Sequence, residues 1–338
     1  MQKLALSLAV ALMMLVVPRL SSAHAENLRS WVASYGSGTA CTRAAPCADF
    51  MTALAATAPG GEINCVDQGD FSSPTSQLLI EKSITIDCEG VQGRLNLAGS
   101  GGAVIDVVAS PTDVVTLRGL DIGGTGSGFP AYGIFFGGGG ALHIEKCVIH
   151  DITSSGQGWG IVASTGNNNG QFNETAAELF VSDTVLENNG TASDGGGILV
   201  IPVVIAFTKV TLNHVEARNN YFGIKADGTD ISGGVINMTV RDSLASGNRS
   251  NGIVGTGNAN GPAIIMLVER TTSSQNATAG FGVIADGPAT TIELTGSTMM
   301  GNINGIGASH GGRLVSYQNN NVSLNSVDGS PTSVIAPK

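Results

Sequence analysis

The sequence predicts an all-β fold, a single-stranded right-handed parallel β-helix of about ten coils with an N-terminal capping helix. One observation is a set of asparagines that recurs 31, 28, 28, 26 and 23 residues apart, at Asn189, Asn220, Asn248, Asn276, Asn302 and Asn325. Short apolar strands and a Gly-apolar dipeptide recur with the same period. Self-similarity at this period is typical of solenoids, in which each repeat forms one structural coil.

Residues 1–25 have the pattern of a secretory signal peptide. Lys3 supplies a positive start, residues 4–17 are apolar, and residues 23–25 (Ala-His-Ala) resemble a small-residue cleavage site. A membrane anchor is the alternative, but an apolar run of about 14 residues is short for a bilayer span. We therefore expect a secreted protein, periplasmic or extracellular, with no transmembrane segment after cleavage.

The ends of a solenoid must be covered because their edge strands would otherwise pair with other chains. Residues 48–57 are expected to form a capping helix with Phe50, Met51 and Leu54 as its buried face, ended by Pro59-Gly60-Gly61. The expected organisation is a signal peptide (1–25), an N-terminal segment with the capping helix (26–60), the β-helix (61–327) and a C-terminal tail (328–338).

Charge limits the partners. Without residues 1–25, which carry two bases and no acid, 14 basic residues face 26 acidic ones, a net charge of −12. This disfavours nucleic acid, whose phosphates require clustered Lys and Arg. It disfavours polyanionic glycans more weakly, since a metal or a local basic patch would compensate.

The five cysteines suggest two disulfides. Cys41 and Cys47 are close enough to close a local loop. Cys65 and Cys88 end matching phrases one coil apart, and stacked coils place equivalent residues about 4.8 Å apart, within disulfide range. Cys147 is left over, and its column of mostly small residues suggests a buried, inert thiol.

Apolar and turn residues align in columns along the coils. A first inward column is expected at Leu117, Ile144, Val181, Leu212, Val240, Val268, Leu294 and Tyr317. A second is expected five residues later, at Ile122, Ile149, Leu186, Ala217, Ala245, Ser273, Met299 and Val322. Between them, two residues after the first column, stand residues that tolerate a left-handed turn, at Gly119, Lys146, Asp183, His214, Asp242, Arg270, Gly296 and Asn319.

A third strand begins at the recurring Gly-apolar pair, for example Gly223-Ile224. If the apolar residue of the pair faces inward, the next residue faces outward. These outward positions are Phe135, Val162, Leu199, Lys225, Val254, Ile284 and Gly307. Most are large and apolar, so they predict a stripe that would mediate oligomer contacts unless loops or the tail cover it. The asparagines are expected to form an internal ladder whose hydrogen bonds offset about 1–3 kcal/mol per buried backbone group.

These features together resemble a known superfamily. The helix, the Pro-Gly-Gly turn and the coils of the form apolar-x-apolar-x-x-Ser/Thr, then Asn, then Gly-Ile resemble the pectate-lyase-like right-handed parallel β-helix proteins, and more narrowly the secreted bacterial β-helix repeat proteins. The resemblance covers roughly residues 45–327 and is specific for fold, not function. The catalytic motifs of the pectate lyases, polygalacturonases and mannuronan epimerases are absent, apart from an isolated His310-Gly311 pair.

The best cluster for chemistry is Lys225, Asp227 and Asp230, which follow one Gly-Ile pair, with Asp286 and His310 after the equivalent strands of neighbouring coils. In the superfamily the groove beside this strand often carries the active site. The carboxylates would bind calcium, and the lysine would act as a base if its pKa were lowered. We favour the simpler interpretation, an exposed lysine beside turn aspartates.

Other charged residues indicate structure rather than catalysis. Arg241-Asp242 and Glu269-Arg270 on adjacent coils are read as surface ion pairs rather than as a lyase arginine beside a metal acid. The histidines lack metal-ligand spacing, so no metal site is expected, and calcium would be a cofactor only of a lyase. The leading interpretation is a cell-surface or extracellular polysaccharide-binding protein. The alternatives are a polysaccharide lyase or glycoside hydrolase, and a structural or adhesive oligomer.

Overall fold

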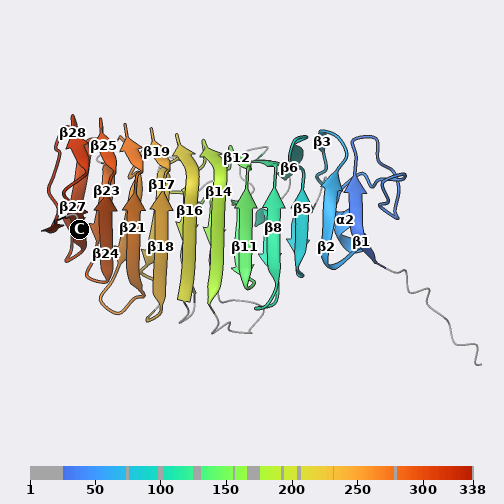
Figure 1. Ribbon diagram of the computed structural model, residues 1–338, viewed down its shortest axis with the longest axis horizontal. Coiled ribbons are helices and arrows are strands. Elements are labelled where there is room, and N and C mark those ends of the chain that lie inside the picture. The colour runs from blue at the N-terminus through green and yellow to red at the C-terminus, as the bar shows by residue number, and fades with distance from the viewer. Residues whose placement is uncertain are drawn as a thin grey trace, which may run out of the picture.

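The chain winds into an elongated parallel β-helix whose coils stack along one axis (Figure 1). The computed structural model describes residues 26–73, 76–97, 102–124, 131–154, 157–165, 176–191, 194–203, 207–230, 232–277 and 280–336. The expected signal peptide lies outside these residues. Within them no helix has the length and apolar character needed to cross a membrane. The predicted fold class is confirmed.

Each coil contributes up to three strands. The first strands are β1 (Asn27–Val32), β2 (Thr57–Cys65), β5 (Ile84–Asp87), β8 (Val114–Arg118), β11 (Ala141–Glu145), β18 (Val235–Arg241), β21 (Ala263–Glu269), β24 (Thr290–Thr295), β27 (Arg313–Tyr317) and, last, β29 (Ser333–Ile335). The second strands are β3 (Gly69–Asp70), β6 (Gly93–Leu97), β9 (Leu120–Gly124), β12 (Val148–His150), β19 (Leu244–Ser246), β22 (Thr272–Ser274), β25 (Thr298–Met300) and β28 (Asn321–Ser323). First and second strands are continuous in β14 (Ala177–Glu187) and β16 (Phe207–Arg218). The third strands are β4 (Leu78–Ile80), β7 (Ala103–Val108), β10 (Tyr132–Gly138), β13 (Trp159–Ala163), β15 (Gly196–Val200), β17 (Phe222–Gly228), β20 (Ile253–Gly257), β23 (Phe281–Asp286) and β26 (Asn304–Ser309).

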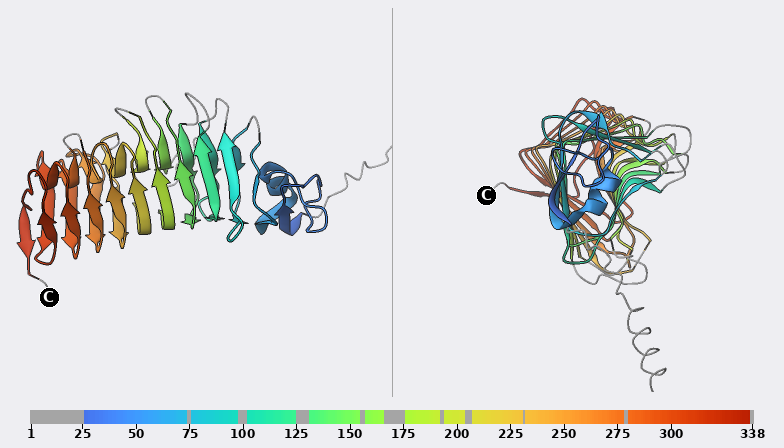
Figure 2. Two further views of the ribbon diagram at one scale, coloured as in Figure 1. Left: turned by 90° about the horizontal axis from the view of Figure 1, so that it is seen from above. Right: turned by 90° about the vertical axis from the view of Figure 1, so that its right-hand side faces the viewer.

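The strands form two parallel sheets. First and second strands share a 20-stranded sheet, and the third strands form a nine-stranded sheet, one strand per coil. Figure 2 shows the coils from the side and along the axis. The Gly-apolar pairs are in register, so that Ile134 pairs with Ile161 and Ile161 pairs with Ile198. All three isoleucines are fully buried, which fills the interior coil by coil.

The first turn, between the first and second strands, is made by one residue in the left-handed conformation. The residues with φ between 45° and 66° at this place are Gly119, Lys146, Asp183, His214, Asp242, Arg270 and Gly296. They are the residues that the alignment of the repeats placed at a turn, apart from Asn319 in the last coil, which does not have this conformation. A single left-handed residue redirects the chain without a loop, which keeps both flanking strands in register.

The last coil corrects the expected alignment. Tyr317 was expected to continue the first inward column, but Ser316 pairs with Leu294 in its place, and fully buried Leu314 pairs with Ile292 two residues earlier. The segment Arg-Leu-Val-Ser-Tyr offers two apolar registers, and the following turn holds one extra residue. The second column is unaffected, since Val322 pairs with Met299 as expected.

The second turn, between the second and third strands, carries the asparagine ladder. Asn248 is fully buried; its Nδ2 donates to the Ala217 carbonyl at 3.1 Å and to Asn276 Oδ1 at 2.9 Å. Its own Oδ1 accepts the backbone N–H of Asn220 at 3.0 Å. The pattern repeats at Asn189, Asn220, Asn248, Asn276, Asn302 and Asn325. The predicted ladder is confirmed.

A column of glycines lies beside the ladder. At Gly223, an added Cβ would lie 2.3 Å from the carbonyl oxygen of Gly252 and 2.9 Å from Asn248 Nδ2. Any larger side chain would therefore push two coils apart at the place where the asparagine bonds both. The Gly-apolar pair recurs because the ladder requires this close approach.

The N-terminal end of the solenoid is capped by a short helix, α2 (Phe50–Ala56). The Asp49 carboxylate accepts the first free backbone N–H of the helix at 2.7 Å, as an N-cap does. Phe50 and Leu54 are buried against the first coils, but Met51 is 41% exposed, contrary to the expected buried face. The helix is only two turns long, and its inward side is completed by alanine instead.

Both predicted disulfides are present. Cys41–Cys47 closes a loop with Cα atoms 4.7 Å apart, and Cys65–Cys88 joins adjacent coils with Cα atoms 4.8 Å apart. The first bridge holds a loop against the outer edge of β1, where the Trp31 N–H donates to the Cys41 carbonyl. Two disulfides indicate a compartment other than the reducing cytoplasm. At the other end, β29 pairs with β27, so strand pairing continues into residues 328–338.

Candidate functional site

The row of outward positions on the third strands is in register from Phe135 to Gly307. Part of the predicted apolar stripe is covered, because Val162, Val254 and Ile284 are only 2%, 3% and 7% exposed. Aromatic rings cover part of the row. At Gly307, an added Cβ would lie 2.4 Å from the ring of Phe281, which begins the neighbouring strand. The stripe therefore offers little free surface for an oligomer contact.

Aromatic side chains gather where the third strands begin. The aromatic cluster consists of Tyr132, Phe135, Trp159, Tyr221 and Phe222. Tyr132 stacks on Phe135 with ring centroids 5.5 Å apart, and Trp159 lies parallel to Phe222 at 6.1 Å. Tyr221 meets Phe222 edge-on at 4.9 Å. Trp159 is buried and the other four rings are half-buried, so each of these four presents part of a ring to solvent.

A glycine makes the parallel pair possible. Gly196 lies between Trp159 and Phe222 in the strand register, and an added Cβ would lie 2.7 Å from the Trp159 ring. The two rings therefore meet across the intervening coil. Sequence reasoning missed this cluster because aromatic residues are only 5% of the chain. The available signal was positional: aromatic residues recur two places before the inward residue of the Gly-apolar pair.

Lys225 and Asp227 form an ion pair beside this cluster. Lys225 Nζ is 2.7 Å from Asp227 Oδ2 and 5.2 Å from the centroid of the Phe222 ring. Burial alone would raise the pKa of Asp227, but hydrogen bonds from Lys225 and Thr229 outweigh it and hold that pKa below its usual range. The carboxylate is thus ionised and its charge is compensated. The pair is well suited to orient a ligand hydroxyl.

Asp230 does not join the pair. It is exposed beyond the end of β17, and within the described ranges no ion pair includes it. Asp286 lies two coils from Asp227 in the same register and accepts hydrogen bonds from Ser309 Oγ at 2.6 Å and His310 Nδ1 at 2.7 Å. Four of the five predicted residues therefore form two separate polar groups, Asp230 belongs to neither, and the five do not make one catalytic centre.

Asp106 is a further carboxyl group on this face. It pairs in register with Phe135, and Gln77 Nε2 donates to its Oδ2 at 3.2 Å. Its Oδ1 is buried and has no hydrogen-bond partner. Burial, only partly offset by Gln77, raises the pKa of Asp106, and the nearby charge of Glu81 adds to the effect. This carboxyl group therefore holds a proton more readily than a surface aspartate does.

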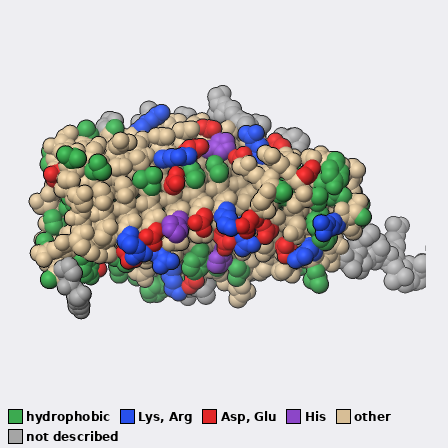
Figure 3. Space-filling model, turned by 45° about the horizontal axis from the view of Figure 1, so that its top comes forward, with side chains coloured by type: hydrophobic (Ala, Val, Ile, Leu, Met, Phe, Trp, Pro, Cys, Tyr) green, Lys and Arg blue, Asp and Glu red, His purple; other side chains and the backbone are tan. Residues whose placement is uncertain are grey.

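The charged first-turn residues form a surface ladder. Arg270 bonds both Asp242 carboxylate oxygens at 2.8 Å and also contacts Glu269, and Arg241 donates to the Asn213 side chain at 2.9 Å. Figure 3 shows acidic, basic and histidine side chains in a row along the body. The Arg270 side chain is 52% exposed, so the arrangement fits the predicted surface ion pairs.

Histidine and cysteine side chains do not form a reactive site. His143 stacks on Phe180, and His150 lies between Asp121 and Asp151. The Cys147 thiol is buried, and desolvation raises its pKa to about 12, so it is not a nucleophile at neutral pH. In the part of the chain that the structure describes, no three His, Cys, Asp or Glu residues could together hold a metal ion.

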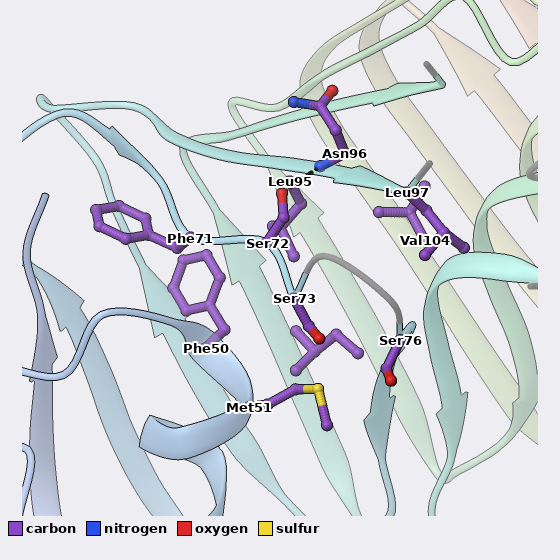
Figure 4. Close-up of a pocket in the computed structure, with 11 residues that line it drawn as sticks. Phe50, Met51, Phe71, Ser72, Ser73, Ser76, Leu95, Asn96, Leu97 and Val104 are labelled. Atoms are coloured by element: carbon purple, nitrogen blue, oxygen red, sulfur yellow. Dashed lines mark hydrogen bonds between the residues drawn. The ribbon is translucent and has the colours of Figure 1, made fainter. Parts of the chain in front are cut away.

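Among the hollows elsewhere on the described part of the chain, two are considered as ligand sites. A crevice between α2 and the first coils, lined by Phe50, Met51, Phe71 and Leu95, encloses about 10 Å³, roughly the room for one water (Figure 4). A shallow hollow of about 280 Å³ lies on the outer face of the first strands; it is lined by Lys209, Val210, Thr211, Asn237, Met238, Thr239, Ile265 and Leu267. The first is too small for a substrate, and the second has no aromatic ring.

Comparisons with known proteins identify the fold. No family model matches the sequence, and no curated protein matches it. Among solved structures, the chain is similar to the pectate lyase Pel9A, with 14% sequence identity and a TM-score of 0.52, over 93% of this chain and 79% of that one. It is also similar to the GH136 lacto-N-biosidase from Eubacterium ramulus, with 11% identity and a TM-score of 0.46, over 92% and 67% of the two chains.

This chain has the pectate-lyase-like parallel β-helix fold. The identity to Pel9A is low, so the likeness extends to the fold and not to the chemistry. The features that bear on function lie on the outer face of the third strands, where the aromatic cluster and the Lys225–Asp227 pair lie side by side.

Proposed function

We propose that this protein is an extracellular polysaccharide-binding protein, and that the aromatic cluster on the outer face of the third strands holds the ligand. The cluster is the observation that carries the proposal. Sugar rings present apolar C–H faces that pack on aromatic rings and hydroxyls that need hydrogen-bond partners. Both elements meet here, because the Lys225–Asp227 pair lies next to Phe222.

The setting supports the proposal in two further ways. The third strands run side by side along the body, so a chain-like ligand can contact several coils at once. Two disulfides and the signal-peptide pattern favour an extracellular or periplasmic location, where polysaccharides occur. The adhesive alternative loses its main support, since the apolar row is largely covered.

Polysaccharide cleavage is a second candidate function, favoured by Asp106. A carboxyl group with a raised pKa beside an aromatic side chain has the properties of a general acid. Incubation with polysaccharides, with and without calcium, tests this function when unsaturated and reducing ends are assayed together. New ends that disappear in Asp106→Asn would support cleavage, and no new ends on any polymer would contradict it.

The binding proposal is tested by retention on a panel of neutral and acidic polysaccharides. Phe222→Ala removes the ring that contacts Trp159, Tyr221 and Lys225, and we expect it to weaken binding at least about tenfold, the effect of losing one well-packed aromatic anchor. Ile265→Ala is the matched control: Ile265 is 52% exposed and lines the hollow on the first strands.

The two variants also locate the site. Loss of retention in Phe222→Ala with full retention in Ile265→Ala supports the third strands. The reverse result would move the site to the first strands and contradict the proposal. Thermal denaturation of both variants checks that the fold is intact, and retention of the wild type on no polysaccharide would disprove the function itself.

A further inference from the structure

Carboxylates outnumber cations around the aromatic cluster. Those linked to the cluster by register, by electrostatic field or through Lys225 are Asp106, Asp194 and Asp227. The described cations beside it are Lys225 and Arg249. This is the reverse of the charge pattern that an anionic polymer requires.

The two cations contribute little free positive charge. Lys225 Nζ is bound to Asp227 at 2.7 Å, and its side chain is only 21% exposed, so the pair is locally neutral. Arg249 is exposed on the turn beside Tyr221, where its backbone N–H donates to the Asn220 carbonyl. Solvent and salt screen a charge at such a rim position. Of these two described cations, Arg249 alone could meet an acidic sugar without first breaking an ion pair.

Two acids lie near aromatic residues of the cluster. Asp194 is exposed at the start of β15, and its charge adds to burial in raising the pKa of Tyr132. Asp106 is the register neighbour of Phe135. A uronic acid packed on either ring would place its carboxylate next to one of these acids. At Tyr132 the like charges of Asp194 and the uronate disfavour binding unless a cation separates them. At Phe135 the repulsion is smaller, because burial raises the pKa of Asp106 and so favours its uncharged form.

The described residues form no evident calcium site that would offset this repulsion. A calcium ion that bridged protein and polyanion would need several oxygen ligands from the protein. Among the residues that the structure describes, no three acidic, histidine or cysteine side chains converge on one point. The described part of this face therefore has neither a basic patch nor a built cation site.

We infer that the aromatic cluster binds neutral glycans and rejects uronate-rich ones. The inference rests on the proposed function and names the ligand class of the same site. The ring faces supply packing for uncharged sugars, and the surrounding carboxylates accept hydrogen bonds from their hydroxyls. The same carboxylates repel a polyanion, so one set of residues provides both affinity and selectivity.

The test uses pairs of polymers that share a backbone and differ in the charge of their substituents. Methyl-esterified pectin is compared with the same pectin after de-esterification, and dextran with carboxymethyl dextran. We expect the neutral member of a pair to bind at least about tenfold more tightly at low salt, a difference of about 1.4 kcal/mol. Added salt should narrow the gap by screening the carboxylates.

A substitution sharpens the test. Asp227→Asn leaves the charge of Lys225 uncompensated beside Phe222, and we expect it to raise affinity for the acidic member at least about threefold, a modest electrostatic gain at a half-buried site. Asp242→Asn makes the same change of net charge on the exposed first turn and should alter neither affinity. A thermal denaturation curve for each variant separates binding effects from loss of fold.

The possible outcomes distinguish the proposed binding function from the inference that the ligands are neutral. Equal or tighter binding of the acidic member by the wild type overturns the inference and leaves the binding function standing. An equal gain in Asp227→Asn and Asp242→Asn overturns the local explanation, because total charge would then decide the selectivity. Binding to no member of any pair overturns the proposed function and the inference with it.

Discussion

The two turns of each coil join neighbouring coils by opposite means. At the second turn, Asn248 and Asn276 are neutral, almost fully buried and bonded to each other at 2.9 Å. At the first turn, Asp242 and Arg270 are charged, have side chains that are 28% and 52% exposed, and are bonded at 2.8 Å. Both contacts join neighbouring coils, and these two bond lengths are nearly equal. Only the surroundings differ.

The difference shows that the strength of a contact depends on whether water can replace the partner when the contact breaks. Water takes the place of the Asp242 carboxylate when Arg270 moves away from it. The ion pairs of the exposed ladder therefore contribute little stability. Water does not reach the Ala217 carbonyl that Asn248 binds, so losing that side chain leaves buried backbone groups unsatisfied. The neutral ladder should therefore hold the coils together, and the charged one should mainly keep the surface polar.

The largest effect is expected for Asn248→Ala. The change unbonds the Ala217 carbonyl and the Asn220 N–H and leaves a cavity, so the free energy of unfolding should fall by about 2–4 kcal/mol. Thermal denaturation measures the loss, and faster hydrogen exchange at the Asn220 amide locates it. Arg249→Ala, on the exposed neighbour in the same turn, is the control. An unaltered melting curve for Asn248→Ala would contradict the importance of the ladder.

An intermediate effect is expected at His150, where the ladder begins. In this coil Ile152 occupies the asparagine position, and the His150 ring is held 2.8 Å from Asp121 and 2.7 Å from Asp151. Hydrogen bonds to these carboxylates raise the pKa of His150 to about 9. A raised pKa stabilises the protein fully below the unfolded value of about 6.5, and this stabilisation is lost as the pH rises through about 9.

The variant His150→Gln tests the pH range over which His150 stabilises the protein. At pH 6 the variant should be less stable than the wild type by about 1–2 kcal/mol, after allowance for solvent screening of a half-buried group. Near pH 10 the two melting temperatures should converge, apart from a pH-independent packing difference. A difference that stays constant from pH 6 to pH 10 would mean that the charge of the imidazolium does not stabilise this turn.

The smallest effect is expected for Arg270→Ala. Its partners Asp242 and Glu269 are solvated, so the melting temperature should stay within the reproducibility of the measurement, and added salt should remove any remaining difference. Denaturation at low and high salt provides the comparison. A loss as large as that of Asn248→Ala would show that the exposed ladder carries stability after all.

Much of the fold could be predicted because each coil of a solenoid packs only on its neighbours along one axis, so the same pattern recurs along the sequence. Coil-to-coil register places residues one period apart against each other, so Cys65 and Cys88 could be joined and the asparagines aligned without any tertiary information. The left-handed turn was visible for the same reason, through residues such as Asp242 and His214. The register failed only at Tyr317, where two neighbouring apolar residues fit the interior equally well.

The candidate site could be predicted only in part. Lys225 and Asp227 were singled out from the sequence, but Asp230 was grouped with them, and only the backbone path beyond β17 separates it from the pair. The sequence left open whether the stripe is covered, because alternation gives the direction of a side chain and not what lies above it. Phe281, for example, folds over Gly307 from the neighbouring coil.

By itself, then, the sequence determined the coil, its period and the residues that face the interior. Interior positions repeat because every coil must fill the same space and satisfy the same backbone groups. Only the tertiary structure decided the outer face: the aromatic cluster exists because Gly196 lets Trp159 and Phe222 meet across a coil. Such contacts depend on the size and direction of single side chains from different coils, and no period in the sequence records them.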